Sequence, residues 1–211
     1  MADLITYTDY KSPYAYLAKD PINAMARELG ISVEWRPYIL DIPAYLGSAR
    51  VDAAGTVLEE SRNGHQWRRV RYSYMDCRRQ ARKQGLTIRG TQKIWDSSLA
   101  AAGMLFAQAA GDDVFHRYND TVFDRFWRRD LDIDDVAVLD SVLRSCGAGG
   151  GFPDQASARR ARVAEIGREA EAAGVFGVPS FVVAGELFWG REHLADVQAM
   201  LCGSAAPGNR P

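Results

Sequence analysis

The sequence has few cysteines, and none of them forms a redox or metal-binding pattern. The three cysteines are odd in number, far apart and outside any C-x-x-C pair: Cys77, Cys146 and Cys202. This distribution argues against a disulfide framework, a zinc site and a dithiol redox centre. The three histidines are also dispersed along the chain, so the sequence predicts no metal site.

The chain also lacks an excess of charge and any long apolar run. Its 26 Lys and Arg nearly balance its 27 Asp and Glu, which gives no support for a nucleic acid or a membrane as partner. No segment approaches the ~20 apolar residues that cross a bilayer. The first residues lack the basic and apolar regions of a signal peptide. We therefore expect a cytoplasmic protein that acts on a small molecule.

What the chain does contain is a strand–helix–strand pattern at its start. Residues 4–7 and 31–36 have strand character, and the second segment alternates apolar and polar residues. Between them, Ser12 followed by Pro13 predicts a helix start, and Gly30 predicts its end. Pro21 is expected to kink or interrupt this helix. A β-α-β unit of this kind favours parallel pairing of its two strands.

The rest of the chain divides into a helical stretch and a second strand-rich end. Residues 37–60 are expected to be irregular, and residues 65–174 carry only helical patterns, sufficient for four or five helices. Residues 180–184 and 187–189 then predict an antiparallel hairpin, and Gly190 opens a last helix. We therefore predict one domain from residues 1–60 and 175–211, with a mixed four-stranded sheet. Residues 61–174 are predicted to form an inserted α-helical domain without a sheet.

This order of elements is that of a thioredoxin-like α/β fold of the DsbA type with a large helical insertion, and two motifs make the resemblance more specific. Residues 9–17, DYKSPYAYL, resemble a serine turn, and residues 176–183, FGVPSFVV, resemble a cis-proline segment. With GELFWGREHL at residues 185–194, they resemble the family of 2-hydroxychromene-2-carboxylate isomerases and kappa-class glutathione transferases.

Ser12 is the predicted catalytic residue. Thioredoxin-fold redox enzymes carry C-x-x-C at the start of the first helix, where the helix dipole and free N–H groups stabilise a thiolate. Here the stretch reads SPYA, and a hydroxyl cannot exchange disulfides. The resemblance implies that Ser12 instead binds and activates the thiol of glutathione. The simpler alternative is an ordinary N-cap worth ~1 kcal/mol.

The resemblance also implies where glutathione binds. A cis bond before Pro179 would present the Val178 backbone to an extended peptide, as the family does for the cysteinyl group. Arg191 and Glu192 open the last helix, where the γ-glutamyl end is expected: Glu192 would pair with its ammonium, and helix-start N–H groups would bind its carboxylate. Alternatively, Glu192 simply suits a first helical turn.

Two regions leave alternatives open. Residues 38–46 lack the lysine of an asparagine–lysine element that often holds the glycyl end in the family, so the cofactor is glutathione or another low-molecular-weight thiol. A basic run within residues 68–83 is interpreted as a solvated helix face. Alternatively, one of its arginines binds a substrate carboxylate in a bidentate manner.

The predicted function is therefore a glutathione-dependent cis-trans isomerase of a conjugated unsaturated oxo acid. The alternatives are a kappa-like glutathione transferase, a double-bond isomerase of natural-product intermediates, and a non-enzymatic DsbA-like module that binds peptides. The resemblance implies a homodimer. Aromatic residues around 115–127 suit either an interface or the core of the insertion.

Overall fold

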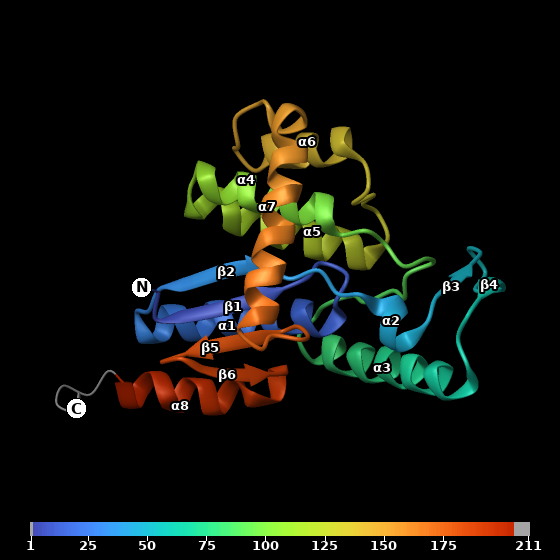
Figure 1. Cartoon of the computed structure of the whole chain (residues 1–211), viewed down its shortest axis with the longest axis horizontal. Helices are drawn as coiled ribbons and strands as arrows, with labels where there is room; N and C mark the ends of the chain where they lie inside the picture. Colours follow the sequence, from blue (N-terminus) through green and yellow to red (C-terminus); the bar gives the residue numbers. More distant parts are fainter. Residues whose placement is uncertain (1, 205–211) are drawn as a thin grey trace. The chain divides into compact units, whose positions relative to one another are not determined.

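The computed structural model describes residues 2–204 and divides into two compact units (Figure 1). The sheet unit comprises Met1–Ile39 and Val163–Pro211, and the helical unit comprises Leu40–Arg162. These units are divided at other residues than the predicted domains, 1–60 with 175–211 and 61–174, and the inserted α-helical domain stays a prediction.

The sheet unit contains four strands in the order β2-β1-β5-β6. β1 (Leu4–Thr8) pairs in parallel with β2 (Val33–Pro37) and antiparallel with β5 (Ser180–Val183), which pairs antiparallel with β6 (Glu186–Trp189). α1 (Pro13–Leu29) connects β1 to β2. The 3₁₀ turn η1 (Arg191–His193) and α8 (Leu194–Ser204) follow β6. The predicted mixed four-stranded sheet is confirmed.

Local sequence explains the ends of α1 but not its continuity. Ser12 caps its start, Pro13 takes the first helical position, and Gly30 ends it in the left-handed conformation with φ 64°. The expected interruption at Pro21 is wrong, because the helix runs from Pro13 to Leu29. Leu17 and Ile22 are completely buried on either side of the proline, and this packing holds the helix where one backbone N–H is missing.

The helical unit begins with structure where the sequence predicted none. Residues 37–60 were expected to be irregular, but they include α2 (Ile42–Leu46) and an antiparallel pair of β3 (Ala49–Val51) and β4 (Val57–Glu60). Asp41 caps α2 by accepting a hydrogen bond from the Ala44 N–H, and Arg50 pairs across the strands with Glu59. These short elements depend on such specific pairs, which carry little periodic signal.

Five longer helices follow these short elements. They are α3 (Gly64–Lys83), α4 (Ser98–Ala110), α5 (Asp112–Arg128), α6 (Val136–Ser145) and α7 (Phe152–Ala172). The boundary between the units falls within α7. The phenylalanine, tyrosine and tryptophan side chains of α5 are buried, and α5 packs against α4 and α6, so these aromatic residues belong to the core of the helical unit.

Tyr118 shows how closely this core is packed. Its ring is completely buried, and its hydroxyl donates a hydrogen bond to the Ala100 carbonyl at 2.9 Å. A Cβ atom at Gly103 would lie 2.1 Å from the same hydroxyl oxygen, so α4 needs glycine there.

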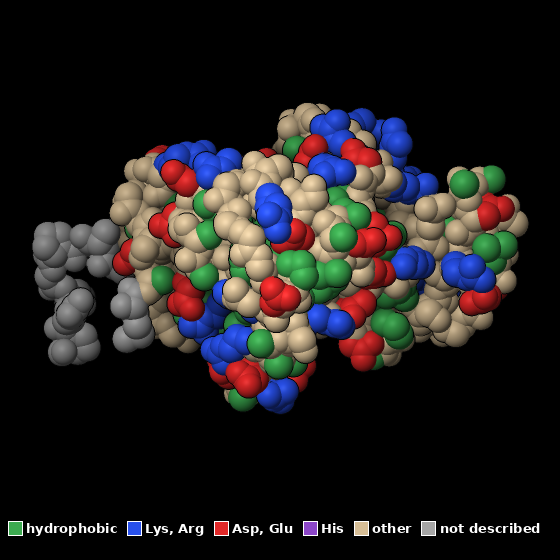
Figure 2. Space-filling model, turned by 90° about the horizontal axis from the view of Figure 1, so that it is seen from above, with side chains coloured by type: hydrophobic (Ala, Val, Ile, Leu, Met, Phe, Trp, Pro, Cys, Tyr) green, Lys and Arg blue, Asp and Glu red, His purple; other side chains and the backbone are tan. Residues whose placement is uncertain are grey.

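The surface carries charges of both signs. Figure 2 shows basic and acidic side chains interspersed over the face drawn.

Candidate functional site

Ser12 lies at the turn between β1 and α1. Its φ of −92° and ψ of 114° are those of an N-cap, and its side-chain oxygen accepts a hydrogen bond from the Ala15 N–H at 3.2 Å. The same hydroxyl donates to the Val178 carbonyl at 3.5 Å. Ser12 is only 3% exposed. Its hydroxyl is therefore both a helix cap and part of a tertiary contact with the segment before β5.

The segment from Gly177 to Ser180 faces this turn. The Val178–Pro179 peptide bond is cis, and the Pro179 carbonyl accepts a hydrogen bond from Gly190 N at 2.9 Å. The Ser180 hydroxyl donates to the Gly177 carbonyl at 2.7 Å. Because β5 pairs with β1, with Ser180 opposite Tyr7, this segment lies beside the serine turn although it is far away in the sequence.

Arg191 and Glu192 occupy the 3₁₀ turn η1, which packs against α1. The Glu192 carboxylate folds back over Gly190: a Cβ atom there would lie 2.5 Å from its Oε2. The Nη1 atom of Arg191 is buried and has no hydrogen-bond partner among the described residues. Within residues 2–204, neither Arg191 nor Glu192 forms a hydrogen bond with Ser12 or Val178. The predicted site residues therefore belong to elements that pack together, but they do not form one hydrogen-bond network.

Sequence reasoning missed a buried ion pair beside Ser12. The Lys11 ammonium lies 3.6 Å from the Asp9 carboxylate, and both side chains are nearly inaccessible. Asp9 also accepts backbone hydrogen bonds, from Lys11 N through its side chain and from Ser12 N through its carbonyl. The sequence feature that could have indicated this pair is an acidic and a basic residue, Asp9 and Lys11, two positions apart immediately before the helix cap.

This arrangement suits an anion better than a redox couple. The helix N-terminus at Ser12 carries partial positive charge, whereas the ammonium of the preceding Lys11 is matched by the buried Asp9 carboxylate. The turn itself has no sulfur. Cys77 and Cys146 are buried in the helical unit, and Cys202 is exposed on α8. A thiolate at the serine turn must therefore come from another molecule.

In residues 2–204, no group of three or more His, Cys, Asp or Glu side chains is arranged to hold a metal ion. No helix in the same range combines the length and the apolar character that crossing a membrane requires.

Comparison with known families identifies the fold. The model of the DSBA-like thioredoxin domain matches residues 3–201, nearly the whole chain. The chain belongs to this family. At the start of α1 this chain reads Ser12-Pro13-Tyr14-Ala15, which contains no C-x-x-C pair.

Three proteins illustrate how this DsbA-like domain relates to others. It is 26% identical over 202 residues to a 2-hydroxychromene-2-carboxylate isomerase from Sphingobium xenophagum, covering 92% of this chain and 95% of that protein. The structure of a 2-hydroxychromene-2-carboxylate isomerase matches with TM-score 0.70 and 22% identity, covering 95% of each chain. A probable DsbA oxidoreductase from Streptomyces coelicolor matches with TM-score 0.72 and 16% identity, covering 100% of this chain and 94% of that one. The two structural matches share the fold.

Proposed function

We propose that the protein is a thiol-dependent isomerase that interconverts the geometric isomers of a conjugated unsaturated oxo acid, with glutathione as the thiol. The observation that carries the proposal is the buried Ser12 hydroxyl, which caps α1 and contacts Val178 where redox members of the fold hold a thiol. The 2-hydroxychromene-2-carboxylate isomerase from Sphingobium xenophagum, similar over 202 residues, supports the reaction class.

The residues of this chain have separable tasks in that reaction. When bound, the thiol would supply a nucleophile for reversible addition to the activated double bond, which would permit rotation about that bond. The Ser12 hydroxyl would donate a hydrogen bond to the thiolate in place of the Val178 carbonyl, and the α1 N-terminus would stabilise its negative charge. The Val178 backbone pairs with the extended cysteinyl segment.

Arg191 and Glu192 are proposed to hold the γ-glutamyl end. The buried Nη1 atom of Arg191 lacks a partner among the described residues, and an α-carboxylate would satisfy it. The Glu192 carboxylate, folded over Gly190, would pair with the ammonium group. The cytosolic disulfide reductase DsbM from Pseudomonas aeruginosa, which has the same fold, was solved with GSH. Because residues 38–46 lack the family's lysine, another small thiol is the alternative cofactor.

The decisive test is the ultraviolet thiolate absorbance of glutathione titrated into the protein across pH. We expect saturable binding with a lowered thiol pKa in the wild type, and loss of the lowered pKa in Ser12→Ala. The control is Asp135→Ala, which removes the cap of α6 in the helical unit. It loses a comparable ~1 kcal/mol of capping energy without touching the serine turn.

The titration and two activity assays together distinguish the candidate functions. An unchanged thiol pKa in Ser12→Ala would remove Ser12 from the mechanism and reduce it to a helix cap. Binding followed by turnover of unsaturated oxo acids supports the isomerase, whether the acid comes from aromatic catabolism or from a natural-product route. Rapid conjugation of chloro-dinitrobenzene would instead favour a kappa-like transferase.

A second candidate function, a peptide-binding module, is favoured by one observation. Phe176 and Trp189 are 60% and 50% exposed, and their rings lie 4.9 Å apart beside the Val178–Pro179 segment. Exposed aromatic side chains next to an extended segment suit a bound peptide strand. This function predicts peptide affinity that does not change when glutathione is added, whereas the isomerase predicts competition.

A further inference from the structure

The helical unit contains an open cavity with an unusual charge. Its volume is about 410 Å³, within the range of small-molecule sites. Five of its lining side chains are cationic and none is acidic; the cations are Arg62, Arg71, Arg78, Lys93 and Arg129. Arg71 and Arg78 belong to the basic run within residues 68–83, which the sequence favours as a solvated helix face. Both border the cavity, so these two arginines are placed where an anion could reach them.

Backbone carbonyls hold three of these arginines in place. The Nε atom of Arg62 donates to the Leu46 carbonyl at 3.0 Å, that of Arg78 to Ile88 at 3.3 Å, and that of Arg129 to Gly90 at 2.6 Å. Because Nε is used for anchoring, the two terminal nitrogens of each guanidinium are left for another partner.

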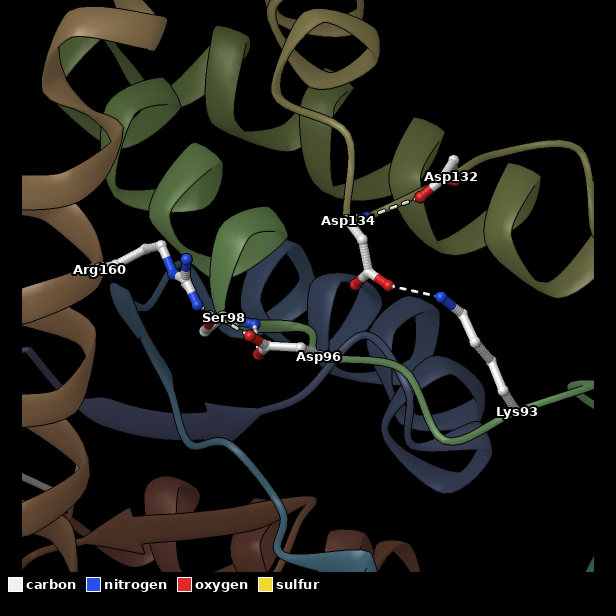
Figure 3. Close-up of polar contacts among 6 residues, drawn as sticks. All are labelled: Lys93, Asp96, Ser98, Asp132, Asp134 and Arg160. Atoms are coloured by element: carbon white, nitrogen blue, oxygen red, sulfur yellow. Dashed lines mark hydrogen bonds and ion pairs between the residues drawn. The ribbon is translucent and has the colours of Figure 1, made fainter. Parts of the chain in front are cut away.

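Only the lysine among these cations has its charge balanced within the described residues. Lys93 pairs with the Asp134 carboxylate at 2.8 Å (Figure 3), and its Nζ lies 4.0 Å from the centre of the Trp95 ring. In the same figure, Asp96 is engaged by Arg160 at 2.8 Å and by the Ser98 N–H, so it is not available to the arginines. In residues 2–204, none of the four cavity arginines forms an ion pair with a carboxylate.

Two aromatic rings complete the cavity. Arg62 and Arg71 lie over Trp67, with 5.1 and 5.8 Å from each guanidinium carbon to the ring centre, and Arg78 lies over Tyr74 at 5.8 Å. Burial lowers the pKa of the Arg62 guanidinium, partly opposed by Tyr74, so this cation has lost part of its hydration. Planar guanidinium groups on aromatic rings form flat walls suited to a flat ligand.

The backbone conformation of Arg129 is unusual for a residue with a side chain. It ends α5 in the left-handed conformation with φ 65°, where glycine is favoured and another residue costs roughly 1 kcal/mol or more. Its side chain reaches the Gly90 carbonyl and the cavity from that position. The unfavourable backbone conformation thus places a fourth guanidinium group at the cavity.

We propose that this cavity binds a planar organic anion with two acidic groups, such as an aromatic dicarboxylate. Four unpaired guanidinium groups repel one another, and a dianion removes that repulsion while each acid group accepts bidentate hydrogen bonds. A single acid group would leave most of the positive charge unmatched. The site requires no thiol and goes beyond the proposed function.

The test uses isophthalate as the probe, measured without glutathione by calorimetry and by the change in intrinsic tryptophan fluorescence, to which Trp67 at the cavity contributes. We expect saturable, salt-sensitive binding that weakens roughly tenfold or more in Arg129→Gly and in Arg78→Gln. Arg129→Gly suits the left-handed backbone, which protects the fold. The control Arg128→Gln removes a neighbouring arginine that pairs with Asp124 and does not border the cavity.

Other outcomes would overturn the proposal. Absence of isophthalate binding, or equal affinity in all variants, rejects the site. Equal binding of the uncharged isophthalamide rejects recognition of the anion, and equal binding of inorganic phosphate rejects recognition of a planar body. Binding must also persist in Ser12→Ala, so failure of this site and failure of the thiol chemistry are separate results.

Discussion

Replacing Ser12 by cysteine tests directly whether the serine turn stabilises a thiolate. The variant Ser12→Cys puts a sulfur where the hydroxyl now accepts the Ala15 N–H and contacts the Val178 carbonyl. It needs no cofactor and no substrate. The quantity to measure is the pKa of the new thiol relative to the ~8.5 of an unperturbed cysteine.

The structure allows this shift to be estimated. The α1 N-terminus contributes about 0.3–1 kcal/mol in favour of an anion. A hydrogen bond from the Ala15 N–H to a charged acceptor contributes about 1.5–3 kcal/mol. At about 1.36 kcal/mol per pH unit, these effects lower the pKa by about 1.3–3 pH units. Burial and the nearby Val178 carbonyl oppose them, because both disfavour negative charge. We therefore expect a thiol pKa of about 6–7.

Thiolate absorbance in the ultraviolet, followed against pH, measures this value. Cys202 is exposed on α8, so the wild-type chain gives the titration of an exposed thiol, and the double variant Ser12→Cys/Cys202→Ser gives that of the introduced thiol alone. The buried Cys77 and Cys146 contribute equally to both proteins. If the introduced thiol had a pKa at or above that of Cys202, the idea that this turn favours an anion would be refuted, and the proposed activation of glutathione would lose its physical basis.

Two glycine substitutions test the packing and the site with matched controls. Gly103→Ala should lower the free energy of unfolding by about 2–4 kcal/mol in denaturant titration, because its Cβ would lie 2.1 Å from the buried Tyr118 hydroxyl. The control Gly167→Ala lies on α7 with no atom within 4 Å of the new Cβ, and it should raise the free energy of unfolding by up to ~1 kcal/mol. If both changes had the same sign, this account of the core would be wrong. Gly190→Ala should displace the Glu192 carboxylate and weaken glutathione binding severalfold in calorimetry, whereas Gly185→Ala, with a similar positive φ but no neighbour within 4 Å, should cost only stability. Equal glutathione affinity in the two variants would remove Glu192 from the cofactor site.

The sheet was predictable because its signals are local. Strand segments are short runs with their own composition, and the Ser12–Pro13 pair and Gly30 mark both ends of α1. The two errors have a common cause. The continuity of α1 through Pro21 depends on the burial of Leu17 and Ile22, which a local rule for proline does not include. The β3–β4 pair depends on contacts between two short strands that are largely exposed, and such strands carry no strong hydrophobic pattern.

The serine turn was predictable as a helix cap, but its tertiary contact was not. The local sequence shows only that a serine precedes a helix, which is common at helix N-termini whether or not the residue has a further function. The contact between Ser12 and Val178 spans 166 residues and exists because β1 pairs with β5. Only the resemblance to a known family linked these segments in advance. The burial of Lys11 with Asp9 was not visible either, since charged residues are exposed unless paired and the pairing is tertiary.

The arginine-lined cavity illustrates the limit of sequence analysis most clearly. Arg71 and Arg78 are seven residues apart on α3, a spacing that a sequence interprets as one solvated helix face. Arg129 comes from the end of α5, and its side chain reaches the carbonyl of Gly90. What distinguishes this cavity from a solvated face is that four arginines from different segments border it without forming an ion pair among the described residues, and that is a property of the folded unit. The isophthalate titration therefore tests information that the three-dimensional arrangement adds to the sequence.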